Sequence, residues 1–224
     1  SRLGAGMHGG ITSPSTQWFR LGVDDPSVAE RPDATDWLDD LTQDMSGVFS
    51  RSNTYLTLHQ CYLHLVFGNS CFLVVPDEQT VLHTILLDEG SYWLAADRRG
   101  RVNTLLRCFS FTASQIRDEF GHAAAQADDT VAQALARQSD EEPYTVWNLI
   151  MPNDGSASPD IPADRPWLSV YWRDGAPPDA VLDLRSYSYN PIIAPRWHVL
   201  SGVYGFGPGH IALSDAKELQ KLES

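Results

Sequence analysis

Long hydrophobic runs are missing from this 224-residue sequence, and both cysteines and basic residues are scarce. No stretch of 18 apolar residues occurs, so the sequence predicts no membrane-spanning helix. The three cysteines, Cys61, Cys71 and Cys108, form no Cys-x-x-Cys pair and leave an odd thiol. This pattern favours reduced, buried thiols of a protein made in the cytoplasm over a disulfide framework.

The shortage of basic residues has its own consequence. Lysine and arginine number 16 against 29 aspartates and glutamates, for a formal charge of −13. DNA affinity comes largely from cationic groups that displace counterions from phosphate. A surface this acidic therefore disfavours stable nucleic-acid binding.

Sequence motifs of catalytic and metal sites are also missing. The sequence has no Gly-x-Ser-x-Gly, no His-Glu-x-x-His and no Cys/His cluster. His59 and His64 lie five residues apart, so a helix would place them about 140° apart around its axis. Adjacent aspartates point apart and fit solvated surfaces better than a catalytic pair; they occur at 24–25, 39–40 and 128–129. We expect no catalytic, cofactor-binding or metal-binding residues, with a hydrolase that uses an unrecognised carboxylate pair as a weaker alternative.

Tryptophan, by contrast, is abundant. A tryptophan buries a large area at low entropic cost, so its abundance suggests a carbohydrate-binding or protein-binding module as an alternative function. Core filling is the ordinary role for most of the seven, which are Trp18, Trp37, Trp93, Trp147, Trp167, Trp172 and Trp197. We expect Trp18, with Phe19 beside it, to be an interface anchor because it lies in a segment with few apolar neighbours.

Apolar periodicity predicts an α+β fold in which antiparallel β meanders pack with helices. Residues 33–49 and 52–67 repeat apolar side chains at helical spacing, and we expect these helices to form an antiparallel pair. Gly68 is placed to end the second helix. Thr112 and Gln115 form a capping box for a helix that Gly121 would close, and a further helix is expected at 128–138.

From residue 70 the apolar period changes to two. Strands are expected at 71–75, 81–87, 91–96 and 101–109, and the simplest arrangement is an antiparallel meander of three or four strands. Further strands are expected at 144–151, 167–173 and 180–187, with a polar loop at 153–165.

The C-terminal part of the chain organises the rest. Ile192, Ile193 and Trp197 are β-type residues bracketed by prolines, which predicts a short edge strand. Four glycines then occur within eight residues, at 202, 205, 207 and 209, and let the backbone turn where side chains would collide. Pro208 suits the first turn of a helix, and apolar residues recur at helical spacing from 210 to 222. We call residues 195–209 the glycine elbow.

A glycine-rich turn before a helix also suggests a phosphate site. The spacing Gly205-x-Gly207-x-Gly209 is not that of a dinucleotide-binding fingerprint, and no Gly-Lys-Ser/Thr follows it. A tightly packed corner is the better interpretation.

The same stretch carries a family resemblance. It reads Pro195-Arg196-Trp197, then Gly202-x-Tyr204-Gly205-x-Gly207-Pro208-Gly209, then Ala212-Leu213-x-Asp215-x-Lys217-x-Leu219. This resembles the signature of the head-to-tail connecting (portal) proteins of short-tailed bacteriophages. The chain departs from that signature at Val203, Phe206 and Gln220, where the family has an acidic residue, an arginine and an asparagine. The chain also resembles the family's sequence pattern at residues 12–21, 67–68 and 90–100, so the resemblance covers nearly the full chain.

The resemblance implies a structural subunit without enzymatic activity or cofactors. It implies an N-terminal arm at 1–33, a wing-like α+β domain at 34–188, and an edge strand, elbow and channel-side helix at 189–224. Elbow and subunit-packing roles would belong to Arg196, Trp197, Tyr204, Gly205, Gly207, Pro208, Gly209 and Asp215.

The resemblance also implies an assembly and its partners. Copies would form a ring, usually of twelve, at one capsid vertex of the virion, after synthesis in the host cytoplasm, with a prophage as one source of the gene. Terminase, scaffold, capsid and tail adaptor proteins would bind the ring, and double-stranded DNA would pass through without specific binding. The first residues look like a cut end, and the last helix lacks a stop signal, so we expect the natural chain to continue.

Overall fold

A computed structural model describes residues 2–137, 142–155, 165–200 and 202–222. The chain forms two compact units, one of residues 1–87 with 193–224 and the other of residues 88–192. The expected α+β class is confirmed. The units cut across the expected segments 1–33, 34–188 and 189–224, because the first β hairpin pairs with a strand near the C-terminus instead of with the strands that follow it.

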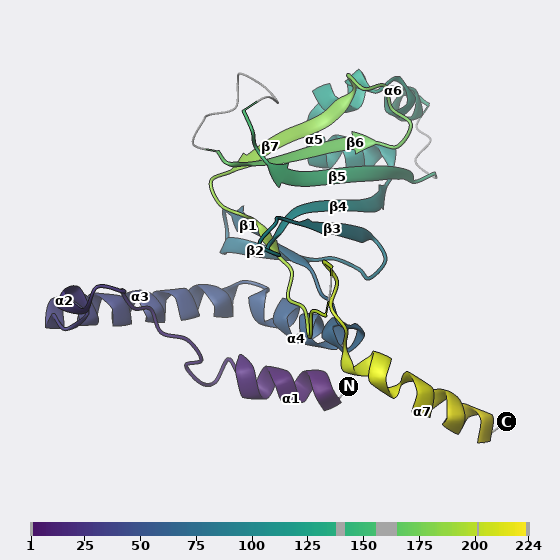
Figure 1. Ribbon diagram of the computed structural model, residues 1–224. Coiled ribbons are helices and arrows are strands. Elements are labelled where there is room, and N and C mark those ends of the chain that lie inside the picture. The colour runs from purple at the N-terminus through teal and green to yellow at the C-terminus, as the bar shows by residue number, and fades with distance from the viewer. Residues whose placement is uncertain (1, 138–141, 156–164, 201, 223–224) are drawn as a thin grey trace. The chain divides into compact units, whose positions relative to one another are not determined.

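Helices make up most of the first unit, together with one small sheet (Figure 1). The N-terminal segment, expected to be irregular, instead begins with a helix. The absent side chain of Gly4 explains this, since a Cβ there would lie 2.3 Å from Leu63 Cδ2. Close packing on another helix outweighs the low helix propensity of glycine. The helices are α1 (Arg2–Ile11), α2 (Pro26–Ala29), α3 (Pro32–Arg51), α4 (Thr54–His64), the 3-10 turn η1 (Leu65–Phe67) and α7 (Pro208–Leu222).

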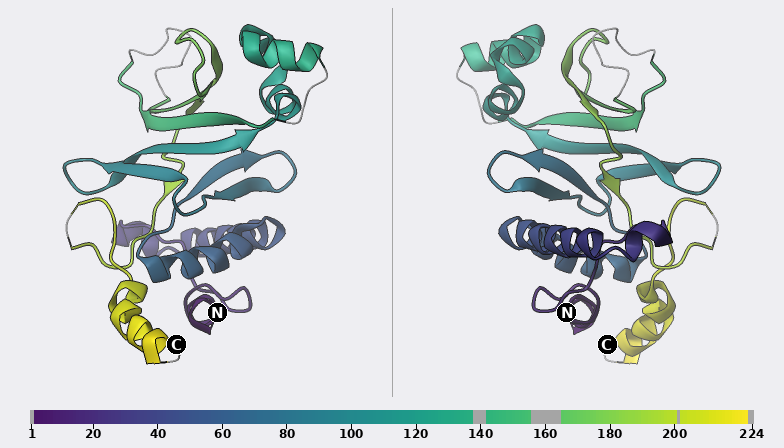
Figure 2. Two further views of the ribbon diagram at one scale, coloured as in Figure 1. Left: turned by 90° about the vertical axis from the view of Figure 1, so that its right-hand side faces the viewer. Right: turned by 90° about the vertical axis from the view of Figure 1, so that its left-hand side faces the viewer.

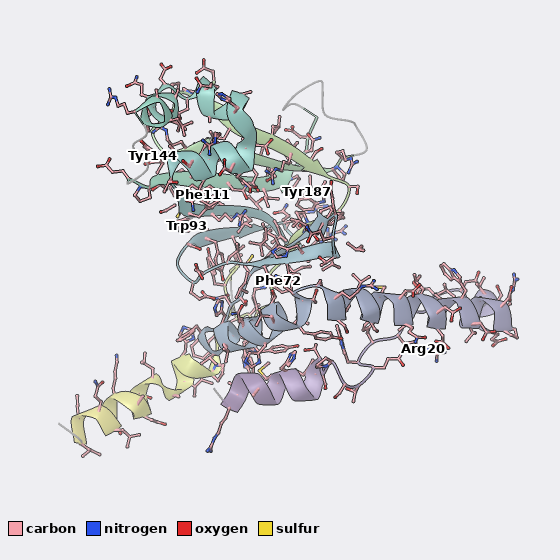
Figure 3. The ribbon with its side chains drawn as sticks, turned by 180° about the vertical axis from the view of Figure 1, so that it is seen from behind. Arg20, Phe72, Trp93, Phe111, Tyr144 and Tyr187 are labelled. Atoms are coloured by element: carbon pink, nitrogen blue, oxygen red, sulfur yellow. The ribbon has the colours of Figure 1, made fainter. Side chains whose placement is uncertain are left out.

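The helices predicted at 33–49 and 52–67 are confirmed as α3 and α4 with η1, but the expected antiparallel pair is wrong. Helix α4 continues in roughly the direction of α3 (Figures 1 and 3). The junction is held by Asn53, whose Nδ2 donates to the Thr84 carbonyl at 2.7 Å and whose Oδ1 accepts from the Thr84 amide at 2.9 Å. Helix α4 packs instead against α1, where the Thr12 and Tyr62 hydroxyls lie 3.0 Å apart.

The sheet of the first unit has the strand order β2-β1-β8. Strands β1 (Phe72–Asp77) and β2 (Val81–Leu86) form an antiparallel hairpin. The edge strand expected around residues 192–200 is present but much shorter, as β8 (Ile192–Ile193). Phe72 of β1 packs with Cys61, Tyr62 and Leu65 to form a buried core under the hairpin.

The second unit is a five-stranded antiparallel sheet covered on one face by two helices (Figure 2). The predicted strands are confirmed, but the meander expected from residue 70 is divided between the two units. Ile116 and Val131 of the helices pack on Val146 and Tyr171 of the sheet. The elements are β3 (Tyr92–Ala96), β4 (Val102–Phe111), α5 (Ala113–Ala127), α6 (Asp129–Ala136), β5 (Tyr144–Pro152), β6 (Trp167–Arg173) and β7 (Val181–Tyr187), and the strands lie in chain order.

Helix caps in the second unit largely follow the sequence. The capping box of Thr112 and Gln115 is confirmed at the start of α5. Gly121, with φ of +88° and ψ of 166°, is non-helical and ends the first helical stretch of α5 at a kink, after which a second stretch continues to Ala127. Most of the loop expected at 153–165 lies outside the described residues. No helix in the described part of the chain is long and apolar enough to span a bilayer.

A buried ion pair joins α6 to the sheet. Asp128 Oδ1 accepts from the amides of Thr130 and Val131 at 3.0 and 3.3 Å and so caps α6. Its other oxygen accepts from Arg173 Nε at 2.6 Å, and the two side chains are only 2% and 11% exposed. One carboxylate therefore satisfies both a helix end and a buried cation.

We predict that Asp128→Asn lowers the free energy of unfolding by about 3 kcal/mol, because the cap acceptor remains while Arg173 loses its counter-charge. Urea unfolding followed by circular dichroism measures the change. The control is Asp129→Asn, an exposed neighbour for which a change of about 0.5 kcal/mol or less is expected. Equal losses in the two variants would contradict the assignment.

Candidate functional site

The glycine elbow lies entirely in the first unit and packs on residues 66–69, which end η1 and lead towards β1. Figure 1 shows this yellow-green segment running from β8 into α7. About 130 residues of sequence separate the two sides of the contact, and the fold brings them together as two touching stretches of backbone.

Hydrogen bonds between main-chain groups align the two stretches. Asn69 and Arg196 form an isolated antiparallel bridge. The Ser70 amide donates to the Pro195 carbonyl at 3.1 Å, and the Trp197 amide donates to the Gly68 carbonyl at 2.9 Å. The elbow thus begins as a short continuation of sheet pairing.

Glycine is required on both sides of the contact. A Cβ on Gly205 would lie 2.3 Å from the Gly68 carbonyl oxygen, and one on Gly207 would lie 2.3 Å from both the Gly68 nitrogen and the Val66 carbonyl oxygen. Gly68 itself has φ of +96°, and its own Cβ would lie 2.4 Å from the Gly205 oxygen. Gly209 is less crowded, with a Cβ position 2.8 Å from the Val66 oxygen. Only chains without side chains at these positions can approach so closely.

Polar side chains close the elbow on itself. The Asn69 Oδ1 accepts from the Gly205 amide at 2.6 Å. Arg196 donates from a terminal guanidinium nitrogen to the Val203 carbonyl at 3.0 Å, which ties the loop across its base. His210 Nδ1 accepts from the Gly207 amide at 3.1 Å, and its ring stacks on Phe206 with centroids 4.9 Å apart.

These hydrogen bonds distinguish a packed corner from a phosphate-binding cradle. A cradle needs free amide groups at the turn before the helix. In the elbow the amides of Gly205, Phe206 and Gly207 donate to Asn69, the His198 carbonyl and His210 respectively. The geometry therefore suits a rigid joint and leaves these three donors unavailable to a nucleotide.

The structure gathers most of the predicted elbow residues and separates one. Asp215 lies on the exposed surface of α7, where its carboxylate accepts from the Ser214 hydroxyl at 3.4 Å. Pro208 begins α7 as expected. The elbow itself contains Arg196, Trp197, Tyr204, Gly205, Gly207, Pro208 and Gly209.

Sequence reasoning missed the other half of the contact. Gly68 was expected to end a helix and lies in a stretch that resembles the family, but neither observation predicts its contact with the elbow. The positive φ of Gly68 fits that helix-stop role, but contact with residues 205–207 is a long-range feature that local periodicity does not contain.

Large apolar side chains point outward around the elbow. We call them the elbow rim, and each is at least a third exposed: Phe67 62%, Trp197 43%, Leu200 70%, Tyr204 45% and Phe206 38%. Exposed apolar clusters of this kind mark surfaces that other molecules cover.

The second predicted pair, Trp18 and Phe19, is packed on its own chain. Trp18 stacks on Phe49 of α3 with centroids 6.1 Å apart and donates from Nε1 to the Tyr55 hydroxyl at 3.2 Å. Both residues line an open groove of about 910 Å³ between residues 14–20 and α3. Contacts within the chain account for the pair, and an interface role stays a prediction.

Within the residues that the structure describes, no group of three or more His, Cys, Asp or Glu side chains could hold a metal ion.

We predict that Gly207→Ala lowers the free energy of unfolding of the protein by about 2 kcal/mol or more, because the new methyl group overlaps the backbone of residues 66–68. Thermal unfolding by calorimetry measures this. Gly47→Ala is the matched control, since no atom lies within 4 Å of its added Cβ and α3 gains helix propensity worth up to about 1 kcal/mol. A Gly207→Ala protein as stable as the parent would contradict the backbone contact.

Comparison with known protein sequences identifies the family of this chain. Residues 1–224 match the family described as bacteriophage head to tail connecting protein. The chain is 37% identical over 221 residues to a probable portal protein of Bordetella phage BPP-1, and 35% identical over 226 residues to the portal protein of Salmonella phage epsilon15. Each alignment covers 97% of this chain and 40% of the relative, so the chain spans less than half the length of these curated relatives. The chain therefore belongs to the bacteriophage head to tail connecting protein family.

Proposed function

We propose that these residues form part of a structural subunit of a portal ring, through which double-stranded DNA enters and leaves a phage head. The family match along the whole chain is the observation that carries this proposal. The two portal relatives support it, because both align over 97% of this chain.

In this role the glycine elbow is an architectural joint. The elbow fixes the direction of α7 relative to residues 66–69, because the close backbone contact prevents the two stretches of chain from sliding past each other. None of the described residues of α7 is buried, so the helix has a full surface free for packing in an assembly. The elbow rim would then contact a neighbouring subunit.

Charge favours a passive conduit. With a net charge of −13, the chain repels the DNA backbone instead of gripping it. A duplex can move past such a wall with few attractive contacts to break. This role depends on the shape and charge of the channel wall and requires no chemical reaction.

The wider assembly follows from the same proposal. Copies would close a dodecameric ring at the head-tail junction of the virion, after synthesis in the host cytoplasm. Terminase, scaffold, capsid and tail adaptor proteins would bind this ring. A carbohydrate-binding role for the tryptophans has no supporting observation.

We predict that the natural full-length protein forms rings with a central hole, visible by negative-stain electron microscopy, and that Trp197→Ser reduces the ring fraction at least severalfold. Trp197 is 43% exposed, so its loss weakens association more than folding. Trp37→Ser is the control, because Trp37 is 62% exposed on α3, outside the elbow rim. Full-length protein that never forms rings would contradict the proposed function.

We also predict that the chain does not retain linear duplex DNA in a gel-shift experiment at about 150 mM salt, because phosphate affinity requires cationic surface. Retention that weakens steeply with added salt would reveal a cationic DNA site and contradict the passive conduit.

A further inference from the structure

The sheet of the second unit has an unusual second face. Strand register places its outward side chains in two rows that run across neighbouring strands. One row is Trp93, Leu106, Leu149, Val170 and Leu184; the other is Cys108, Trp147, Trp172 and Val181. We call these nine residues the tryptophan face. All are half-buried or exposed, and none is charged.

The opposite face shows why this is unusual. There, alternate residues such as Val146, Tyr171 and Leu182 are buried under α5 and α6. An antiparallel sheet with one covered face commonly presents polar side chains on the other. Here the nine residues of the uncovered face are uncharged and mostly apolar, which is typical of a surface that another molecule covers. Trp93, labelled in Figure 3, lies on β3, an edge strand of this sheet, and is 47% exposed.

Ring geometry argues against a sugar as the occupant. Trp147 and Trp172 are stacked with an interplanar angle of 17° and centroids 6.5 Å apart, and Trp93 lies 5.7 Å from Trp147. The Trp93 and Trp147 planes are tilted by 36°, so the three rings form no single flat platform of the kind on which a sugar ring packs. The absence of any cation in the two rows equally disfavours nucleic acid.

Charge around the face identifies a better occupant. Copies of a chain with a net charge of −13 repel one another on average, so association favours surfaces of low charge, and none of the nine residues of the tryptophan face is charged. The carboxylate of Asp174 beside them accepts from Trp147 Nε1 at 3.1 Å. At one end of the face the β3–β4 turn carries Arg98 and Arg99, both exposed. No salt bridge is found for either within the described residues, because Asp97 of the same turn pairs with Arg101. A second copy of this acidic chain can offer carboxylates to these two arginines.

We propose that the tryptophan face is a docking surface for a neighbouring copy of this protein. This inference rests on the proposed ring. The neighbour covers the face with a different part of its own surface, because a patch that pairs with itself closes a two-fold dimer and leaves no ring. The apolar rows supply the contact area, and the arginine turn at their end orients the neighbour's acidic surface.

Cys108 provides a native probe of this contact. It lies in the second row and is half-buried, whereas Cys61 and Cys71 are 2% and 0% exposed. The experiment reacts natural full-length protein with a small maleimide, both as assembled rings and as unassembled subunits separated by gel filtration. Mass spectrometry of the peptide that contains Cys108 gives the rate at that thiol. We expect Cys108 to react about tenfold or more slowly in rings than in subunits, since thiol reactivity depends on access.

A matched pair of variants tests the same surface without the thiol. Val181→Asp places a carboxylate on the tryptophan face at a residue that is 40% exposed, and Val81→Asp places one on the β1–β2 hairpin at a residue that is 63% exposed. Val181→Asp is expected to reduce the ring fraction at least severalfold, and Val81→Asp to leave it unchanged. Circular dichroism establishes that both variants fold.

The outcomes separate this inference from the function on which it rests. Rings in which Cys108 reacts as fast as in subunits overturn the docking surface and leave the portal function standing. Cys108 that is protected equally in rings and subunits shows that other parts of the same chain cover the face, which also overturns the inference. Full-length protein that forms no ring overturns both.

Discussion

The structure of the first unit depends on one close contact between two stretches of main chain, residues 66–69 and the glycine elbow. The contact combines sheet-like hydrogen bonds from Ser70 and Trp197 with glycine packing tight enough that any Cβ would overlap backbone atoms. Because the chain's own Asn69 and His210 satisfy the elbow's amides, the joint is closed without a ligand. The contact therefore fixes the direction in which α7 begins, and none of the described residues of this helix is buried.

Association of an acidic chain with itself imposes a second constraint. A net charge of −13 opposes contact between copies, so assembly favours surfaces of low charge. The residues of the elbow rim and of the tryptophan face are uncharged, and they lie in different units of the chain. In the proposed ring, repulsion of DNA and contact between copies would belong to different parts of the surface.

Local features of this fold could be predicted from the sequence, and long-range ones could not. The capping box at Thr112 and the strand alternation of residues 144–151 are determined by neighbouring residues, and the structure confirms them. The helix α1 was missed because its four glycines are poor helix formers, and the long-range packing of Gly4 against Leu63 cannot be seen in the local sequence. The elbow residues could be predicted from their glycine spacing and family resemblance. Their partner Gly68 could not, since it reads locally as an ordinary helix stop.

The glycine elbow is a joint closed by the chain itself. Amide hydrogen exchange at Gly205, Phe206 and Gly207, resolved by NMR or by mass spectrometry, tests it most directly. We predict slow exchange at all three amides in the protein alone, at rates comparable to those of amides in the buried strands. Fast exchange that slows only when a nucleotide or phosphate is added would contradict it.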